Sequence, residues 1–211
     1  MDRFELKKDY PSLYAPRSRT WEVLDVPPML AIAVDGAGDP NMSPDYVEAV
    51  SALFSVAYTI KFAAKAQGRE MVVGPLEGLW WAEDPRSFIE RDKGAWSWRM
   101  LIVQPPWVDE VTLEAAVAKV AAKQAVKGAG LGSTALSKLT LVTLNGGRCA
   151  QVLHIGSYDD EGPTLADLHD RFMPEHGLAF NGPHHEIYVG DPRRTAPEKL
   201  KTVLRQPVRP A

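Results

Sequence analysis

The chain has 211 residues, a formal net charge of -3 and a pI near 6.0, with 45% hydrophobic and 24% charged residues. This composition is typical of a globular protein that buries a core, and it provides no basic field to attract nucleic acid or an anionic membrane. The charged N-terminus has no signal-peptide pattern, and Cys149 is the only cysteine. We therefore expect a cytoplasmic protein without a disulfide, a membrane span or a nucleic-acid partner.

The first predicted elements are a strand, a helix and two further strands. The strand MLAIAVDG covers residues 29–36. Ser43 is a suitable N-cap for the helix, and apolar residues at helical spacing extend it to about Gln67, with Gly68 as the stop. The aromatic fragments WWAEDP and MLIVQP then indicate strands around residues 80–85 and 100–105.

The second half of the chain repeats this order. The fragments CAQVLHIG, IYVGDP and TVLRQP resemble the three strand fragments of the first half, at offsets of 120, 107 and 102 residues. A helix is predicted between the first two fragments, at 164–173, with Thr164 and Asp167 as a capping box. A separate helix at 109–126 and the glycine-rich segment KGAGLGS connect the halves.

The repeat predicts an α+β fold built from two strand-helix-strand-strand (SHS2-type) modules related by a pseudo-twofold axis. We expect a single domain over 1–211, with module one at 21–106 and module two at 138–207. The modules should share an antiparallel sheet with helices on one side and a central cleft where they meet. The terminal residues are expected to form only an arm (1–20) and a tail (208–211).

The segment HHEIYVGDP, residues 184–192, is the strongest candidate for a functional site. Because strand side chains alternate, His184, Glu186 and Tyr188 should lie on one face. A carboxylate among apolar neighbours is costly unless it is paired, protonated or solvated. The alternatives are an exposed edge-strand glutamate, or one paired with Arg193 or Arg194.

Tryptophans in the first module are further candidates. Trp80 and Trp81 should lie on opposite faces of one strand, and the 107-residue offset gives Trp81 the position that Tyr188 has in module two. We therefore expect Trp81 to converge with Glu186 and Tyr188 in the cleft, although such rings more often serve only packing.

Neither a metal nor a cofactor is expected. His184, His185 and Glu186 are adjacent rather than at the spacing of a zinc motif, and the chain has no phosphate-binding loop and no dinucleotide fingerprint. His154 lies in an apolar strand, where we expect a hydrogen-bonded core residue.

The strings VDGAGDPN, YTIKF, PLEGLWW, HIGSYDDEGPT and HHEIYVGDPRRTAPEKLKTVLRQPV resemble the GyrI-like small-molecule-binding family. The resemblance covers nearly the whole chain and is to the standalone branch without a DNA-binding domain. It implies a duplicated fold whose cavity is lined by aromatic residues and contains a glutamate. The family's Glu-x-Tyr motif falls on Glu186 and Tyr188, and its double Trp on Trp80 and Trp81.

The resemblance implies a protein that captures hydrophobic or cationic aromatic small molecules, as the drug-binding domains of MerR-type and AraC-type regulators do. It also leaves open a hydrolase that opens cyclopropane rings of genotoxic compounds with Glu186 and Tyr188, or a sensor subunit of a regulator. The expected ligand-binding residues are Tyr58, Trp80, Trp81, Trp98, Glu186 and Tyr188.

Overall fold

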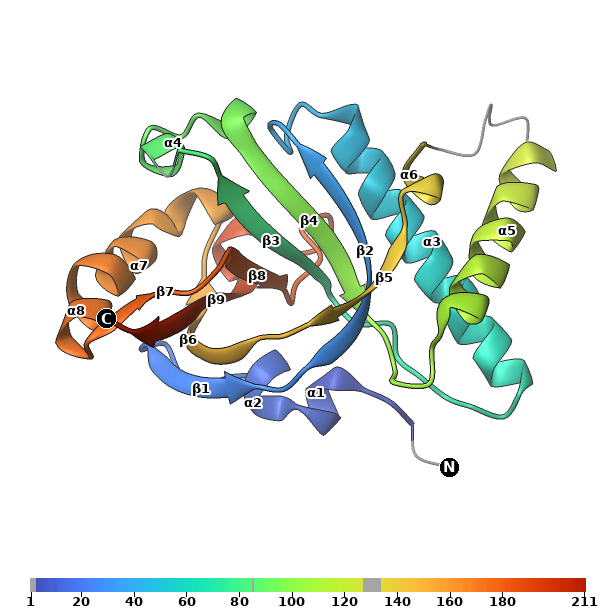
Figure 1. Cartoon of the computed structure of the whole chain (residues 1–211), viewed down its shortest axis with the longest axis horizontal. Helices are drawn as coiled ribbons and strands as arrows, with labels where there is room; N and C mark the ends of the chain where they lie inside the picture. Colours follow the sequence, from blue (N-terminus) through green and yellow to red (C-terminus); the bar gives the residue numbers. More distant parts are fainter. Residues whose placement is uncertain (1–2, 85, 127–133) are drawn as a thin grey trace.

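The computed structural model describes residues 3–84, 86–126 and 134–211 and is dominated by one curled antiparallel sheet (Figure 1). The strands are β1 (Glu22–Val26), β2 (Met29–Ala37), β3 (Leu76–Ala82), β4 (Trp96–Val103), β5 (Thr140–Leu144), β6 (Gly147–Ile155), β7 (Leu178–Phe180), β8 (His184–Tyr188) and β9 (Lys201–Pro210). Their order in the sheet is β1-β6-β9-β8-β3-β4-β2-β5, and β7 pairs with β9. The predicted α+β class is confirmed.

Helices join these strands, and most are short. They are α1 (Leu6–Asp9), α2 (Pro11–Tyr14), α3 (Pro44–Ala66), α4 (Arg86–Ile89), α5 (Glu110–Val126), α6 (Thr134–Ser137), α7 (Gly162–Asp167) and α8 (Met173–Glu175), with a π-helical turn η3 (Leu168–Phe172) between α7 and α8 and 3₁₀ turns η1 (Lys93–Ala95), η2 (Tyr158–Asp160) and η4 (Pro197–Lys199). The predicted glycine-rich loop, 127–133, lies outside the described residues.

The structure confirms the predicted N-cap of the first module helix but not that of the second. The Ser43 hydroxyl accepts a hydrogen bond from the Tyr46 backbone amide, as expected of an N-cap for α3. The capping box at Thr164 is wrong, because α7 begins at Gly162 and has no side-chain cap. Pro163 supplies the fixed φ that suits a first helical turn, so the helix starts two residues earlier than predicted.

The strand order is symmetric about its centre. Strands β2, β4 and β3 form one half, β6, β9 and β8 form the other, and β3 pairs with β8 between them. The first half runs strand, helix, strand, strand (β2, α3, β3, β4), and the second half follows the same course with the short strand β7 inserted before β8. At the edges the halves exchange strands, since β1 pairs with β6 and β5 pairs with β2. A residue-by-residue duplication stays a prediction.

The helices cover the two ends of one sheet face and leave its centre to β3 and β8. In Figure 1, α3 and α5 lie at the right of the sheet, whereas α7 and α8 lie at the left. Leu53 and Val56 of α3 pack in a core cluster with strand residues of β2 and β4, and Leu168 and Phe172 of η3 pack with those of β6 and β9. Residues of β3 and β8 on this face therefore lie between two helix-covered regions.

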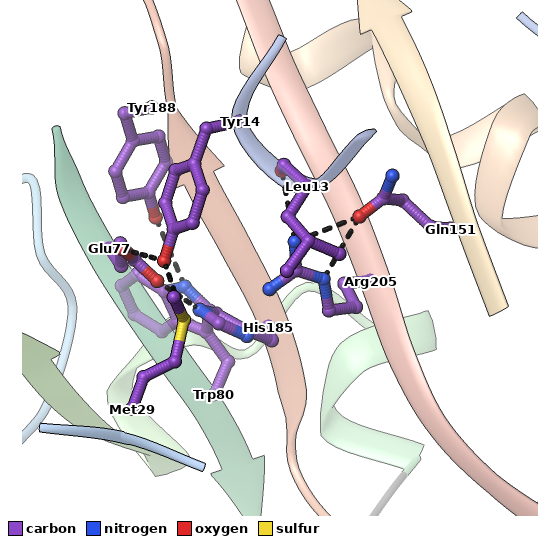
Figure 2. Close-up of polar contacts among 9 residues, drawn as sticks. All are labelled: Leu13, Tyr14, Met29, Glu77, Trp80, Gln151, His185, Tyr188 and Arg205. Atoms are coloured by element: carbon purple, nitrogen blue, oxygen red, sulfur yellow. Dashed lines mark hydrogen bonds and ion pairs between the residues drawn. The ribbon is translucent and has the colours of Figure 1, made fainter. Parts of the chain in front are cut away.

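The N-terminal segment covers the opposite face of the sheet, so its description as an arm is wrong. Leu6, Leu13 and Tyr14 are buried there. The Tyr14 hydroxyl donates to Glu77 Oε1 at 3.0 Å, and Glu77 Oε2 lies 2.7 Å from His185 Nε2 (Figure 2). The C-terminal tail is likewise part of β9, which pairs with β7 as far as Pro210.

Helix α3 is the one described helix that is long and apolar enough, by length and composition, to cross a membrane. The core helix of a globular domain passes the same test, and Leu53, Val56 and Ile60 of α3 are buried against the sheet and its neighbours. Its hydropathy is explained by this packing.

We expect Tyr14→Phe to destabilise the protein by about 1 to 3 kcal/mol, because the change leaves the buried Glu77 carboxylate without one of its donors. Denaturant unfolding measures the effect. Tyr10→Phe is the matched control, since among the described residues the Tyr10 hydroxyl has no hydrogen-bond partner. Equal stability of the two variants would show that the N-terminal segment is held by apolar packing alone.

Candidate functional site

Glu186 occupies the centre of the helix-bearing face. The register places it opposite Gly78 of β3 on one side and Leu204 of β9 on the other, so it is not on an edge strand. Its side chain is only 16% exposed. Arg193 forms its ion pair with Asp191 instead. Arg194 forms no ion pair with Glu186 among the described residues, so the structure supports neither an edge-strand glutamate nor a pair with Arg193 or Arg194.

Tyr188 and Trp80 form a polar pair beside Glu186. The Trp80 indole Nε1 donates to the Tyr188 hydroxyl oxygen at 3.0 Å (Figure 2). Because this bond uses an acceptor lone pair, the Tyr188 O–H remains able to donate, either to Glu186 or to a ligand. A Cβ atom on Gly78 would lie 2.7 Å from Trp80 Nε1 and 3.2 Å from the Tyr188 hydroxyl. Only glycine leaves room for this pair.

Aromatic rings from several elements surround this pair. Tyr46 of α3 lies 6.3 Å from Trp80 and 5.3 Å from Trp98, measured between ring centroids. Trp96 lies 6.0 Å from Trp80, and Phe88 lies 5.0 Å from Trp96. The buried Trp98 Nε1 has no hydrogen-bond partner among the described residues. The rings form a packed cluster, so a ligand bound here would have to displace or separate some of them.

Two predicted ligand residues lie elsewhere. Trp81 pairs with Ser97 and points to the face opposite Trp80, so its predicted convergence with Glu186 is wrong. The strand register explains the error, because an offset of 107 is odd and equates residues on opposite faces. Tyr58 is 45% exposed and lines a hollow of ≈ 330 Å³ between α3 and α5, away from the Glu186 cluster.

A second carboxyl group, which the sequence did not indicate, enters the site from the turn after β6, in the same half of the chain as Glu186. Glu161 follows η2, is 5% exposed, and its Oε1 atom has no hydrogen-bond partner among the described residues. In the same turn, the Tyr158 ring lies 5.5 Å from the Tyr188 ring, edge to face. His154 holds the turn, with Nε2 3.2 Å from the Ser157 carbonyl, which confirms it as a hydrogen-bonded core residue.

Burial dominates the electrostatics of both carboxyl groups. It raises the pKa of Glu186 to about 7, against the opposing effects of the Tyr188 hydroxyl and the Lys93 ammonium. Burial, followed by the charge of Glu186, raises the pKa of Glu161 to about 9. His184 Nε2 lies 3.6 Å from Glu186, but burial lowers the pKa of His184 to about 3, so it is neutral.

This arrangement can hold a planar or cationic aromatic molecule, and it can exchange protons near neutral pH. The rings offer stacking surfaces, Glu186 offers negative charge, and Tyr188 offers a hydroxyl donor. Among the described residues, no group of three or more His, Cys, Asp or Glu side chains is arranged to hold a metal ion. The fold is that of a small-molecule-binding domain of the α+β class.

The chain belongs to the GyrI-like small molecule binding domain family, whose profile matches residues 20–209. It is 38% identical to a conserved protein from Listeria innocua, with a TM-score of 0.87 over 98% of this chain and 100% of that one. A hydrolase from Listeria innocua is also 38% identical, with a TM-score of 0.83 over 99% and 100% of the two chains. No curated protein matches the chain significantly.

The same fold occurs in a more distant protein. The EcmrR C-terminal domain has a TM-score of 0.55 and 10% identity, over 91% of this chain and 98% of that domain. At this identity the likeness concerns the fold alone.

Gly78→Ala should disrupt the Trp80–Tyr188 pair and destabilise the protein by about 1 to 3 kcal/mol, because the new methyl group overpacks the site. Denaturant unfolding followed by tryptophan fluorescence reports both the stability and the environment of Trp80. Gly162→Ala is the control, since a Cβ there would meet no atom within 4 Å. A Gly78→Ala protein with unchanged stability and emission would show that the pair is not closely fitted to Gly78.

Proposed function

We propose that the protein captures hydrophobic or cationic aromatic compounds at the Glu186 cluster. The observation that carries this proposal is a largely buried carboxyl group that has no Lys or Arg ion-pair partner among the described residues and is surrounded by aromatic rings. A buried carboxylate without a cationic partner is unfavourable, and a bound organic cation would supply the missing charge.

The rings and the carboxylate would act on different parts of a ligand. Contact between a cation and a ring face contributes about 0.5 to 2 kcal/mol, and apolar burial acts on charged and neutral ligands alike. A dissociation constant in the micromolar range, about -8 kcal/mol, is expected for a lipophilic aromatic cation. Charge selectivity should then depend on Glu186, and shared affinity on Trp80.

Glu186→Gln should weaken tetraphenylphosphonium binding by about tenfold or more and leave neutral triphenylphosphine oxide nearly unchanged, because only the charge is removed. Trp80→Leu should weaken both ligands through the loss of ring surface. Fluorescence quenching and calorimetry measure the affinities.

Trp81→Leu is the matched control, since Trp81 lies on the other face of β3. Equal weakening of both ligands by Glu186→Gln would mean that Glu186 maintains the fold rather than the charge of the site. If Trp81→Leu weakened binding as much as Trp80→Leu, the ligand would not be confined to the face of β3 that carries Glu186, and the proposed site would be wrong.

A second candidate function is hydrolysis of a cyclopropane conjugated to a dienone. It is favoured by the similarity, at 38% identity over nearly the whole chain, to a protein described as a hydrolase. In this reaction Glu186 accepts a proton from water while the water oxygen bonds to a cyclopropane carbon. The breaking C–C bond sends its electrons through the dienone to the carbonyl oxygen, where Tyr188 donates a hydrogen bond. That oxygen then takes a proton from solvent and Glu186 releases its proton to solvent, so the net change is the addition of one water molecule. General base help of this kind is worth ~10² to 10⁴ in rate.

The hydrolase function predicts multiple turnovers. The purified protein is incubated with excess cyclopropane-dienone compound, and the ring-opened alcohol is followed by mass spectrometry. Wild type should convert many equivalents, and Glu186→Gln should still bind but react ~10² to 10⁴ times more slowly, because it lacks the base. Capture of a single equivalent without product would exclude the hydrolase function and leave the binding function in place.

A further inference from the structure

Two carboxyl groups from different elements of the second half lie in the candidate site. Glu186 comes from β8, and Glu161 comes from the turn that precedes α7. The turn lies over β8, because the Tyr158 ring lies 5.5 Å from the Tyr188 ring. The Gly156 amide, which leads into the turn, donates to the Leu200 carbonyl just before β9, and the charge of Glu186 acts on Glu161. The two carboxyl groups therefore lie within one another's electrostatic range.

The surroundings of this pair are short of positive charge. Among the described residues Glu161 has no ion-pair partner, and one of its oxygen atoms has no hydrogen-bond partner. Asp159, in the same turn, is occupied by Arg91 and Lys93 at the surface. The charged or titratable groups that face the pair from neighbouring elements are Lys93, Tyr46, Tyr158, Asp159, His184, Tyr188 and Asp191.

Most of these neighbours do not titrate between pH 6 and 9. Burial raises the pKa of Tyr158 to about 12, and the pKa values of Tyr46 and Tyr188 are raised further. His184 is neutral. The protons that the site can gain or lose near neutral pH are therefore those of Glu161 and Glu186.

We propose that Glu161 and Glu186 form a carboxyl pair that retains a proton when the site is empty or holds a neutral ligand, and releases it when an organic cation binds. The inference rests on the proposed binding function and names its ligand class. A neutral ligand meets a protonated carboxyl group that can donate a hydrogen bond, and a cation meets a pair whose negative charge increases to match it. One site thereby accepts aromatic compounds of both kinds.

The direction of the pH dependence follows from the pair. With pKa values of about 7 for Glu186 and about 9 for Glu161, the empty site at pH 8 has Glu186 mostly ionised and Glu161 mostly protonated. A bound cation favours ionisation of Glu161, so a proton leaves. By linkage, the cation affinity should then rise with pH by up to about tenfold per unit, until Glu161 is ionised without ligand.

The test is isothermal titration calorimetry of the full chain with tetraphenylphosphonium at pH 8, in phosphate and in Tris. These buffers differ in ionisation enthalpy, so the difference in measured heat counts the protons released. Wild type should release up to about one proton per cation bound. Glu161→Gln should bind the cation with no proton release and with an affinity that is flat from pH 8 to 9. Glu198→Gln, which removes an exposed carboxylate on η4, should behave as wild type.

The outcomes separate the two proposals. Cation binding by wild type without proton release would overturn the carboxyl pair and leave the binding function intact. Failure of both tetraphenylphosphonium and neutral triphenylphosphine oxide to bind would overturn the binding function itself. If Glu161→Gln does not fold, the wild-type protein still decides between the outcomes. Its binding of neutral triphenylphosphine oxide must release no proton, and the affinity for this compound must not increase between pH 7 and 9.

Discussion

The pairing of β3 with β8 is the constraint on which the rest of the structure depends. Its register sets Gly78 opposite Glu186 on one face, and the adjacent residues Glu77 and His185 fall on the other face. Glu77 is fully buried, but it is satisfied by the Tyr14 hydroxyl and by His185. Glu186 is held less closely, because His184 Nε2 lies 3.6 Å away and no hydrogen bond to its side chain is formed among the described residues. The same two strands therefore carry one acid that is held within the fold and one that, in the proposed binding function, would meet the ligand.

The available acids have a cost that depends on pH. Because the folded state raises the pKa of both Glu161 and Glu186, it binds more protons than the unfolded chain above the ordinary carboxyl pKa. The stability that protonation contributes is present at acid pH and is lost as the pH rises through about 7 and then about 9. Such a cost is common where a binding site needs an unpaired charge, and a bound cation would offset it.

Periodicity and capping were sufficient to predict the main elements, because they are local properties. Ser43 capped α3 as expected, and the alternation that set Glu186 and Tyr188 on one face was confirmed. The N-terminal segment was mistaken for an arm, since nothing local to Tyr14 shows that its hydroxyl reaches Glu77, 63 residues away. Glu161 was missed for a related reason. Glu161 precedes Gly162 and Pro163, a pattern typical of a solvent-exposed helix N-terminus. Only the pairing of β8 with β9 brings this residue close to Tyr188.

In the proposed binding function, the aromatic cluster would let one site accept ligands of different shapes while Glu186 selects for charge. Its rings contact one another in edge-to-face, stacked and tilted pairs, and each such contact is worth about 0.5 to 1.5 kcal/mol beyond burial. A ligand ring that replaces a protein ring restores much of that energy, so many aromatic shapes can be accepted at similar cost. Tyr158, 40% exposed at the edge of the cluster, belongs to the same turn as Glu161. The exposed edge of the cluster and the second carboxyl group therefore belong to one turn, so in the proposed function a ligand that contacts Tyr158 would lie close to the group whose charge changes.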